Sequence, residues 1–202
     1  MNLYQNDLPS SVAFQKSVAI DTEAMGLAIK RDRLCLVQLC FGDGVPHLVQ
    51  IQKNQQDKSE NLKRLLTDES ILKIFHYARF DVSILNHTFG IKVGPIYCTK
   101  IASKLVRTYS DKHGLKNLCR ELLGVDISKQ EQSSDWGREK LSPEQLKYAA
   151  GDVLHLHKLK GILDNMLHRE GRMALAEQCF KAVQLFSDLE LSDINPDELF
   201  LH

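Results

Sequence analysis

Residues 17–23 have the sequence SVAIDTE, which predicts a short apolar strand that ends in acidic residues. Residues 34–41, LCLVQLCF, predict a second strand that is rich in β-formers and almost continuously apolar. Residues 46–51 predict a third strand, and the segment GDG at 42–44 has the composition of a hairpin turn before it. Strands therefore come first along the chain.

Beyond residue 60 the pattern changes, and strands alternate with helices. Residues 71–75 predict a buried strand. Residues 79–89 have apolar side chains at helical spacing, and Gly90 follows at a position that suits a C-cap. Further helices are expected from residue 61 to 66, over 99–106, and over 115–123 with Gly124 at its end.

A last long helix is expected after Ser142, because Ser is a favoured cap and Pro143 suits the first turn. This helix should continue to about residue 168. The order of elements indicates an α/β domain with a mixed central sheet flanked by helices. We assign residues 1–170 to this domain and residues 171–202 to a C-terminal helical extension with an acidic tail.

The composition is that of a globular protein. Of the 202 residues, 43% are hydrophobic and 26% are charged, which suits one domain with a real core. No apolar run approaches the ~20 residues of a membrane span, and the N-terminal segment lacks the features of a secretory signal. We therefore expect a cytoplasmic protein. The five cysteines form no CxxC pair, and we interpret them as buried thiols.

The acidic pair in the first strand is the sharpest local signal. Asp21 and Glu23 are two residues apart, so both side chains should lie on one face of the strand. Like charges this close need a positive charge between them. Carboxylate oxygens favour Mg²⁺ or Mn²⁺. A solvated strand end is the simpler interpretation of this motif taken alone.

Two further motifs contain acids next to helix positions. Asp81 lies in the first turn of the helix that follows His76, where an acid is also common for electrostatic reasons. Tyr148 and Asp152 are four residues apart on the last long helix, so the phenol and the carboxylate share a face. Gly151 costs a helix ~1 kcal/mol relative to alanine, which suggests a packing reason for it.

Together these motifs resemble the DEDD exonuclease superfamily, and specifically its tyrosine branch, which includes ribonuclease D. The segment Ser134-Asp135-Trp136 is also similar to ribonuclease D. The resemblance implies a ribonuclease H-like exonuclease fold, two divalent cations, and 3′-5′ cleavage that releases 5′-mononucleotides. The positions that match the motifs are Asp21 and Glu23 in the first, Asp81 in the second, and Tyr148 and Asp152 in the third.

A closer resemblance is to the nano-ribonuclease C family, in the stretches 31–39, 73–81 and 98–136. The match extends from about residue 7 to about residue 170. That family consists of single-domain proteins that degrade di-ribonucleotides and other very short RNA and that form ring-shaped octamers. The resemblance therefore implies short single-stranded RNA as the partner and a homo-oligomer as the assembly.

The resemblance also implies a role for each matched residue. Asp21 would bridge two metal ions, Glu23 and Asp152 would complete the site of one, and Asp81 would help to hold the other through water. Tyr148 would orient or deprotonate the attacking water. Because a free tyrosine has a pKa near 10, it is a poor base at neutral pH, and we expect it mainly to position that water.

Substrate contacts are expected on both sides of these motifs. Leu27 or Met25 could wedge against a base, and Gly26 could let the backbone approach a ligand. His76 stands beside the acidic residues and could contact the substrate or only form a structural hydrogen bond. The basic, hydroxyl-rich stretch 107–136 is the candidate for holding a 5′-phosphate. Its candidate residues are Arg107, Lys129, Gln130, Ser133, Ser134 and Trp136.

Several alternatives remain open. Longer RNA is the substrate of ribonuclease D, but we find no counterpart here of its C-terminal nucleic-acid-binding domains, which favours short RNA. Single-stranded DNA is a third substrate, because 2′-hydroxyl contacts decide the sugar. A catalytically dead binding module is disfavoured because all five catalytic positions are intact. The acidic segment after Glu177 could dock on the basic region 92–140 of a neighbouring copy, although a solvated surface explains the same uneven charge.

Overall fold

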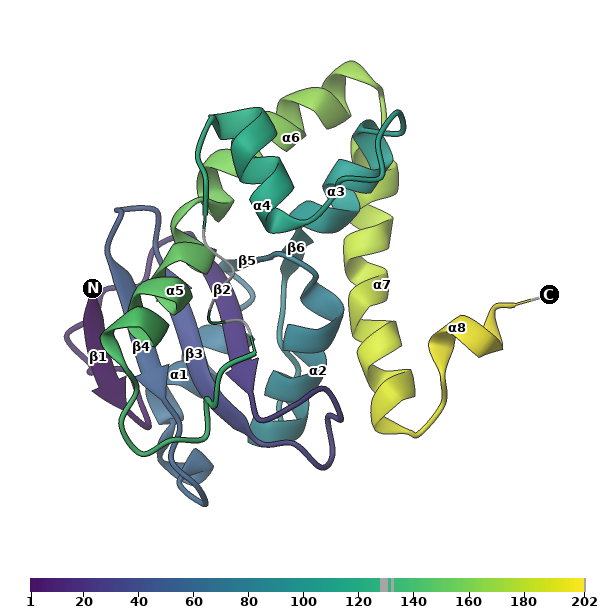
Figure 1. Cartoon of the computed structure of the whole chain (residues 1–202). Coiled ribbons are helices and arrows are strands. Elements are labelled where there is room, and N and C mark those ends of the chain that lie inside the picture. Colours follow the sequence, from purple (N-terminus) through teal and green to yellow (C-terminus); the bar gives the residue numbers. More distant parts are fainter. Residues whose placement is uncertain (128–130, 132, 202) are drawn as a thin grey trace.

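The computed structural model describes residues 1–127, 131 and 133–201, and a six-stranded mixed sheet lies at its centre (Figure 1). The strands are ordered β1-β4-β3-β2-β5-β6 in space. β2 pairs antiparallel with β3 and parallel with β5, so it is an interior strand. The strands are β1 (Asn2–Gln5), β2 (Ser17–Ala24), β3 (Leu34–Cys40), β4 (Pro46–Gln50), β5 (Leu72–Phe75) and β6 (Ile96–Cys98).

β2 is the strand that positions the acidic pair. Its apolar first half is fully buried between neighbouring strands and helices, and β3 beside it is buried along its whole length. Thr22 is buried, whereas Asp21 and Glu23 are partly exposed. Because side chains alternate between the two faces of a strand, the two acids lie on the same face. The sheet thus supplies a rigid base for both carboxylates.

Helices pack against this sheet and against one another (Figure 1). α5 covers β2, β3 and β4, while α7 lies beside α2 and also contacts the edge strand β6. No helix in the described ranges is long and apolar enough to cross a membrane. The helices are α1 (Glu60–Thr67), α2 (Ala78–Phe89), α3 (Thr99–Val106), α4 (Leu115–Leu118) with a π-helical turn (Cys119–Leu123), α5 (Pro143–Leu154), α6 (Leu156–Arg169), α7 (Met173–Leu191) and α8 (Pro196–Leu199), and a 3₁₀ turn spans Gln56–Lys58.

The structure confirms the predicted fold class and several helix ends. Gly90 and Gly124 both adopt the left-handed conformation at helix C-termini, with φ of 64° and 68°. Ser142 caps α5 through a reciprocal capping box with Gln145. These local signals were reliable because each one depends on a backbone conformation that few residues accept.

Three details differ from the sequence-based expectations. β1 and β6 were not predicted, because both are short strands: β1 pairs parallel with β4, and β6 pairs parallel with β5. The single helix expected over 143–168 is two helices that meet at His155. The acidic tail expected within 171–202 begins only after Leu191, because α7 continues to that residue and packs on α2.

Candidate metal and catalytic site

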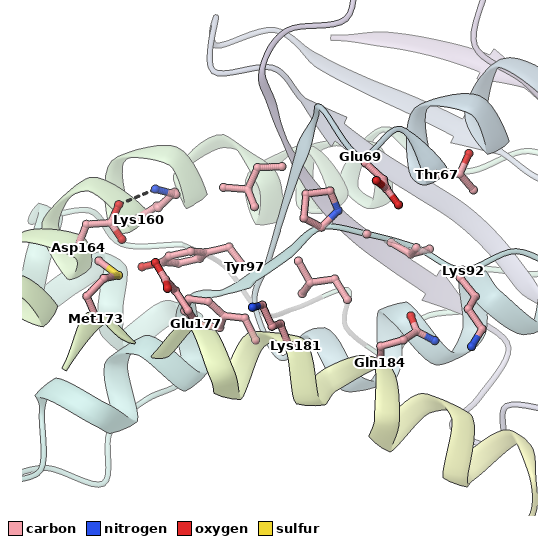
Figure 2. Close-up of a pocket in the computed structure, with 16 residues that line it drawn as sticks. Thr67, Glu69, Lys92, Tyr97, Lys160, Asp164, Met173, Glu177, Lys181 and Gln184 are labelled. Atoms are coloured by element: carbon pink, nitrogen blue, oxygen red, sulfur yellow. Dashed lines mark hydrogen bonds and ion pairs between the residues drawn. The ribbon is translucent and has the colours of Figure 1, made fainter. Parts of the chain in front are cut away.

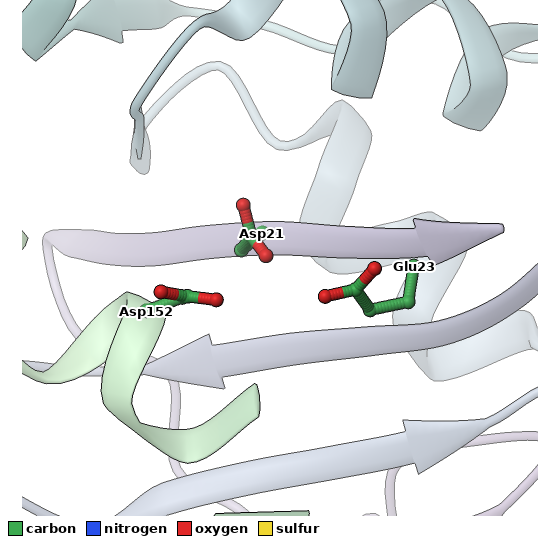
Figure 3. Close-up of side chains that lie close together, drawn as sticks. All are labelled: Asp21, Glu23 and Asp152. Carbon is green, nitrogen blue, oxygen red and sulfur yellow. The ribbon is translucent and has the colours of Figure 1, made fainter. Parts of the chain in front are cut away.

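Three carboxylates from two distant segments meet on one face of the sheet. Asp21 and Glu23 project from β2, and Asp152 projects toward them from α5 (Figure 3). One ligand oxygen from each of the three lies within 4.8 Å of the others. Among the described residues, this is the one group of three or more acidic, His or Cys side chains close enough to share a metal ion.

Asp81 joins the site from the first turn of α2. Its side chain is buried, and its carboxylate accepts a hydrogen bond of 2.6 Å from Thr22 Oγ1. Thr22 lies between the two acids of β2, so this bond ties α2 to the strand that carries them. Asp81 is not part of the close trio. The role of Thr22 was missed in the sequence, since a threonine in a strand gives no signal of its own.

Burial and the charges of neighbouring acids raise the pKa values of Asp21 and Glu23, and burial is the largest cause for Asp81. Burial is the largest cause that raises the pKa of Asp21, followed by the charges of Asp81, Asp152 and Glu23. Burial and the charges of Asp152 and Asp81 raise the pKa of Glu23 to about 9. Burial also raises the pKa of Asp81, and the Thr22 hydrogen bond opposes that rise. A bound divalent cation would remove this repulsion, so the donor set fits Mg²⁺ or Mn²⁺.

Tyr148 lies on the same helix as Asp152, one turn earlier. Its ring centroid is 6.0 Å from that of Trp136, so the indole fixes one side of the phenol. Burial, followed by the charges of Asp152, Glu23 and Asp21, raises the pKa of Tyr148 above its ordinary value. The hydroxyl therefore stays protonated at neutral pH and acts as a hydrogen-bond donor, with Asp152 as its partner.

The acids line a cleft of about 460 Å³. Lys100 and Lys116 line the same cleft, and neither was among the predicted site residues. The Lys100 ammonium lies 3.9 Å above the ring of Tyr77, which adopts a positive φ of 68° just before α2. The other lining residues are Asp21, Thr22, Glu23, Leu27, His76, Phe80, Asp81, Gly114, Leu115, Ile127, Tyr148 and Asp152.

Two of the predicted substrate contacts lie in this cleft. Leu27 is 83% exposed there, which leaves it accessible to a ligand. His76 also lines the cleft, and its Nδ1 is 2.9 Å from Thr99 Oγ1, so part of its role is structural. Met25 is 60% exposed but lines a neighbouring groove.

Arg107 was wrongly predicted as a phosphate contact. Its side chain is 1% exposed, and its guanidinium pairs with Glu121 and donates to Lys112 O at 2.9 Å. Buried arginines are paired in this way because an unpaired buried charge is costly. Gly26 lies close to another side chain, since a Cβ there would be 2.2 Å from Asp32 Oδ2. Its contact with a ligand stays a prediction.

The remaining candidates come from the segment before α5. Ser134 Oγ accepts a hydrogen bond from Gln145 Nε2 at 2.9 Å, so it stabilises the start of α5. Trp136 is buried in a small cluster with Tyr148 and is a support for that residue, not an exposed platform. Ser133 is exposed. Lys129 and Gln130 lie outside the described residues.

A larger cavity of about 710 Å³ lies elsewhere, between β6, α6 and α7 (Figure 2). Tyr97 and Phe180 are among the residues that line it, and their ring centroids are 4.5 Å apart. Lys160 lies over the Tyr97 ring and pairs with Asp164 at 2.5 Å. The charges that line this cavity are thus partly neutralised by each other.

Comparison with known proteins agrees with this site. The profile of a family described as 3′-5′ exonuclease matches residues 5–168. Ribonuclease D of Granulibacter bethesdensis is 36% identical over 157 residues, which is 78% of this chain and 39% of that protein. The chain therefore spans about two fifths of the length of the curated relatives that it matches.

Solved structures extend the similarity. Brucella melitensis NrnC bound to pGG is 54% identical, with a TM-score of 0.91 over 95% of this chain and 93% of that one. The same Brucella protein is also known with bound Mg²⁺, at 53% identity, a TM-score of 0.90 and the same coverage. Escherichia coli RNase D is 26% identical, with a TM-score of 0.74 over 85% of this chain and 45% of that one. On its sequence and its fold, this chain belongs to the 3′-5′ exonuclease family that includes ribonuclease D.

Proposed function

We propose that this chain is a two-metal 3′-5′ exoribonuclease that hydrolyses short RNA, preferentially di-ribonucleotides, to 5′-mononucleotides. The observation that carries the proposal is the group of three carboxylates, Asp21, Glu23 and Asp152, gathered beside Tyr148 in one cleft. Acids placed so closely repel one another, and a divalent cation between them removes that repulsion.

Each residue of the cleft then has a role in hydrolysis. When bound, the divalent ions supply Lewis-acid and water-activating chemistry for in-line displacement at phosphorus. Asp21, Glu23 and Asp152 would hold one ion, and Asp21 with Asp81 would hold the other. Tyr148 keeps its proton, because burial and the nearby acids raise its pKa. It would therefore orient the attacking water by a hydrogen bond and would not remove a proton from it.

The cleft also suggests how a short substrate is held. Its volume of about 460 Å³ lies within the range of small-ligand pockets. Lys100 and Lys116 line the cleft together with the acids, and ammonium groups are suited to bind phosphate oxygens. The complex of Brucella melitensis NrnC with pGG supports a dinucleotide as the ligand.

Turnover on 5′-phosphorylated RNAs of two, three, five and twenty nucleotides, with Mg²⁺ or Mn²⁺, tests this proposal. We expect a steep preference for the dimer and loss of activity in Asp21→Asn on the order of 10³-fold. Comparable rates at all lengths would reject the dinucleotide preference and keep the exonuclease. Full activity in Asp21→Asn would reject the site itself.

A second candidate is a general exonuclease that processes longer RNA, or single-stranded DNA. The similarity to ribonuclease D supports it, and the twenty-nucleotide substrate, as RNA or as DNA, distinguishes it. The homo-octamer and the cytoplasmic location stay predictions. Light scattering on the purified protein tests the octamer.

A further inference from the structure

The C-terminal extension runs along the helix that carries Asp81. α7 packs antiparallel beside α2 (Figure 1), and side chains join the two helices along their length. Asn86 Nδ2 donates to Ser187 Oγ at 3.1 Å in the buried middle of this seam. Beyond the C-terminal end of α2, Lys92 pairs with Asp188 at 3.1 Å on the surface. Asp188 of α7 is therefore bound within the same chain.

Glu190 lies next to the first turns of α2. Its Oε1 accepts a hydrogen bond of 2.6 Å from Arg79 Nε, and its Oε2 accepts one of 2.7 Å from Ser83 Oγ. Both oxygens of the carboxylate are thus used, and both ion-pair partners are about three quarters buried, at 26% and 24% exposure. Arg79 also pairs with Asp197 at 3.1 Å, so α8 adds a second acid.

The geometry of the helix makes this contact relevant to the site. Arg79 and Ser83 are four residues apart and share one face of α2, while Asp81 lies two residues from each. At 100° per residue, Asp81 lies about 200° from either one, on the opposite face. Glu190 therefore contacts the face of α2 that carries Arg79 and Ser83. On the opposite face, Asp81 accepts its hydrogen bond from Thr22.

The start of α2 depends on contacts outside its own backbone, because the first N–H groups of a helix have no partner within it. It is preceded by Tyr77 in the left-handed conformation, whose own side chain makes no capping hydrogen bond. The backbone at Tyr77 and Ala78 bonds instead to the Cys98 thiol. The two charge-assisted bonds to Glu190 supply a restraint on the side chains of that turn.

We propose that Glu190 is a positioning residue, which fixes the first turns of α2 so that Asp81 stays at the distance from β2 that metal binding requires. The C-terminal extension is then part of the catalytic apparatus. This inference rests on the proposed role of Asp81 in the metal site.

The test compares Glu190→Ala with Asp188→Ala, which removes an acid two residues earlier on the same helix whose partner, Lys92, lies beyond the C-terminal end of α2. We expect Glu190→Ala to lower kcat about 10- to 100-fold with KM for the dimer little changed, as for the outer partners of metal ligands. Mn²⁺ binding, measured by calorimetry without substrate, should weaken in parallel. Asp188→Ala should retain kcat and Mn²⁺ affinity.

Ser83→Ala keeps the experiment decisive if Glu190→Ala does not fold. It removes one of the two bonds to Glu190, and we expect a smaller loss of kcat and of Mn²⁺ affinity in the same direction. Wild-type kcat and Mn²⁺ affinity in the folded variants would overturn the inference. Asp81→Asn separates the two proposals, because an active Asp81→Asn protein would instead reject the role of Asp81.

Discussion

The acidic cleft and the seam between α2 and α7 both concentrate carboxylates, but they neutralise them differently. At the seam, Glu190 accepts bonds from Arg79 and Ser83 of the same chain. In the cleft, burial and repulsion raise the pKa values of Asp21 and Glu23. Neither acid takes part in an ion pair within the described residues. The carboxylate of Glu190 is thus neutralised by its own chain, whereas Asp21 and Glu23 fit a cation from solution.

Removing the hydroxyl of Tyr148 tests whether the cleft does more than bind cations. In Tyr148→Phe the ring still packs on Trp136, but nothing orients the attacking water from that side. We expect kcat on the dimer to fall on the order of 10²-fold, with Mn²⁺ affinity by calorimetry unchanged. Tyr109→Phe, at a tyrosine that is 76% exposed, is the matched control. Unchanged turnover in Tyr148→Phe would remove the residue from the mechanism.

Removing the ammonium of Lys100 tests whether the cleft binds phosphate with its own cations. We expect Lys100→Ala to raise KM about tenfold for a 5′-phosphorylated dimer, since hydrogen bonds to charged groups contribute ~1.5–3 kcal/mol. The effect should be smaller for a dimer without the 5′-phosphate. Lys104→Ala, at an exposed position on the same helix α3, is the control. Equal KM changes for both dimers would exclude contact between Lys100 and the 5′-phosphate.

The pH dependence of the metal-free protein's stability is the smallest of the expected effects. The pKa of Glu23 is raised from 4.5 to about 9, so the folded, metal-free protein binds this proton more tightly than the unfolded chain does. Stability from this group is therefore complete below pH 4.5 and is lost as the pH rises toward about 9. In chelator, we expect the Tm to fall over this range.

The variant Glu23→Gln isolates that contribution from other titrating groups. Its Tm in chelator should decrease less between pH 5 and pH 8, by roughly a few degrees relative to the wild-type protein. Added Mn²⁺ should stabilise the wild-type protein most at the higher pH, where the acids are unprotonated. Parallel Tm curves for the two proteins in chelator would contradict the assigned cause.

The contrast between Asp81 and Arg107 shows what sequence patterns can predict about a site. Asp81 was identified because its motif, together with the other two acidic motifs, resembles an exonuclease family, and the structure places it in the cleft. Arg107 was chosen only for its charge, and it is buried against Glu121. Charge alone does not distinguish a surface cation from a buried partner, because that depends on which acid the fold brings beside it.

The strands, helix ends and residue spacings that depend on local chemistry could be predicted from the sequence. These are the apolar strands that begin with residues 17–23, the glycine and serine helix ends, and the i,i+2 and i,i+4 spacings that pair Asp21 with Glu23 and Tyr148 with Asp152. Periodicity and backbone preference act over a few residues, so they can be recognised without the fold.

Contacts between residues that are distant in sequence depend on the tertiary structure. It placed Asp152 against the β2 acids, brought Lys100 into the same cleft, and set Glu190 behind the turn that carries Asp81. Such contacts join residues that are far apart along the chain, and they form only when the sheet and helices are packed together. Short-range sequence patterns do not encode these contacts, so the residues that support Asp81 could not be predicted from the sequence.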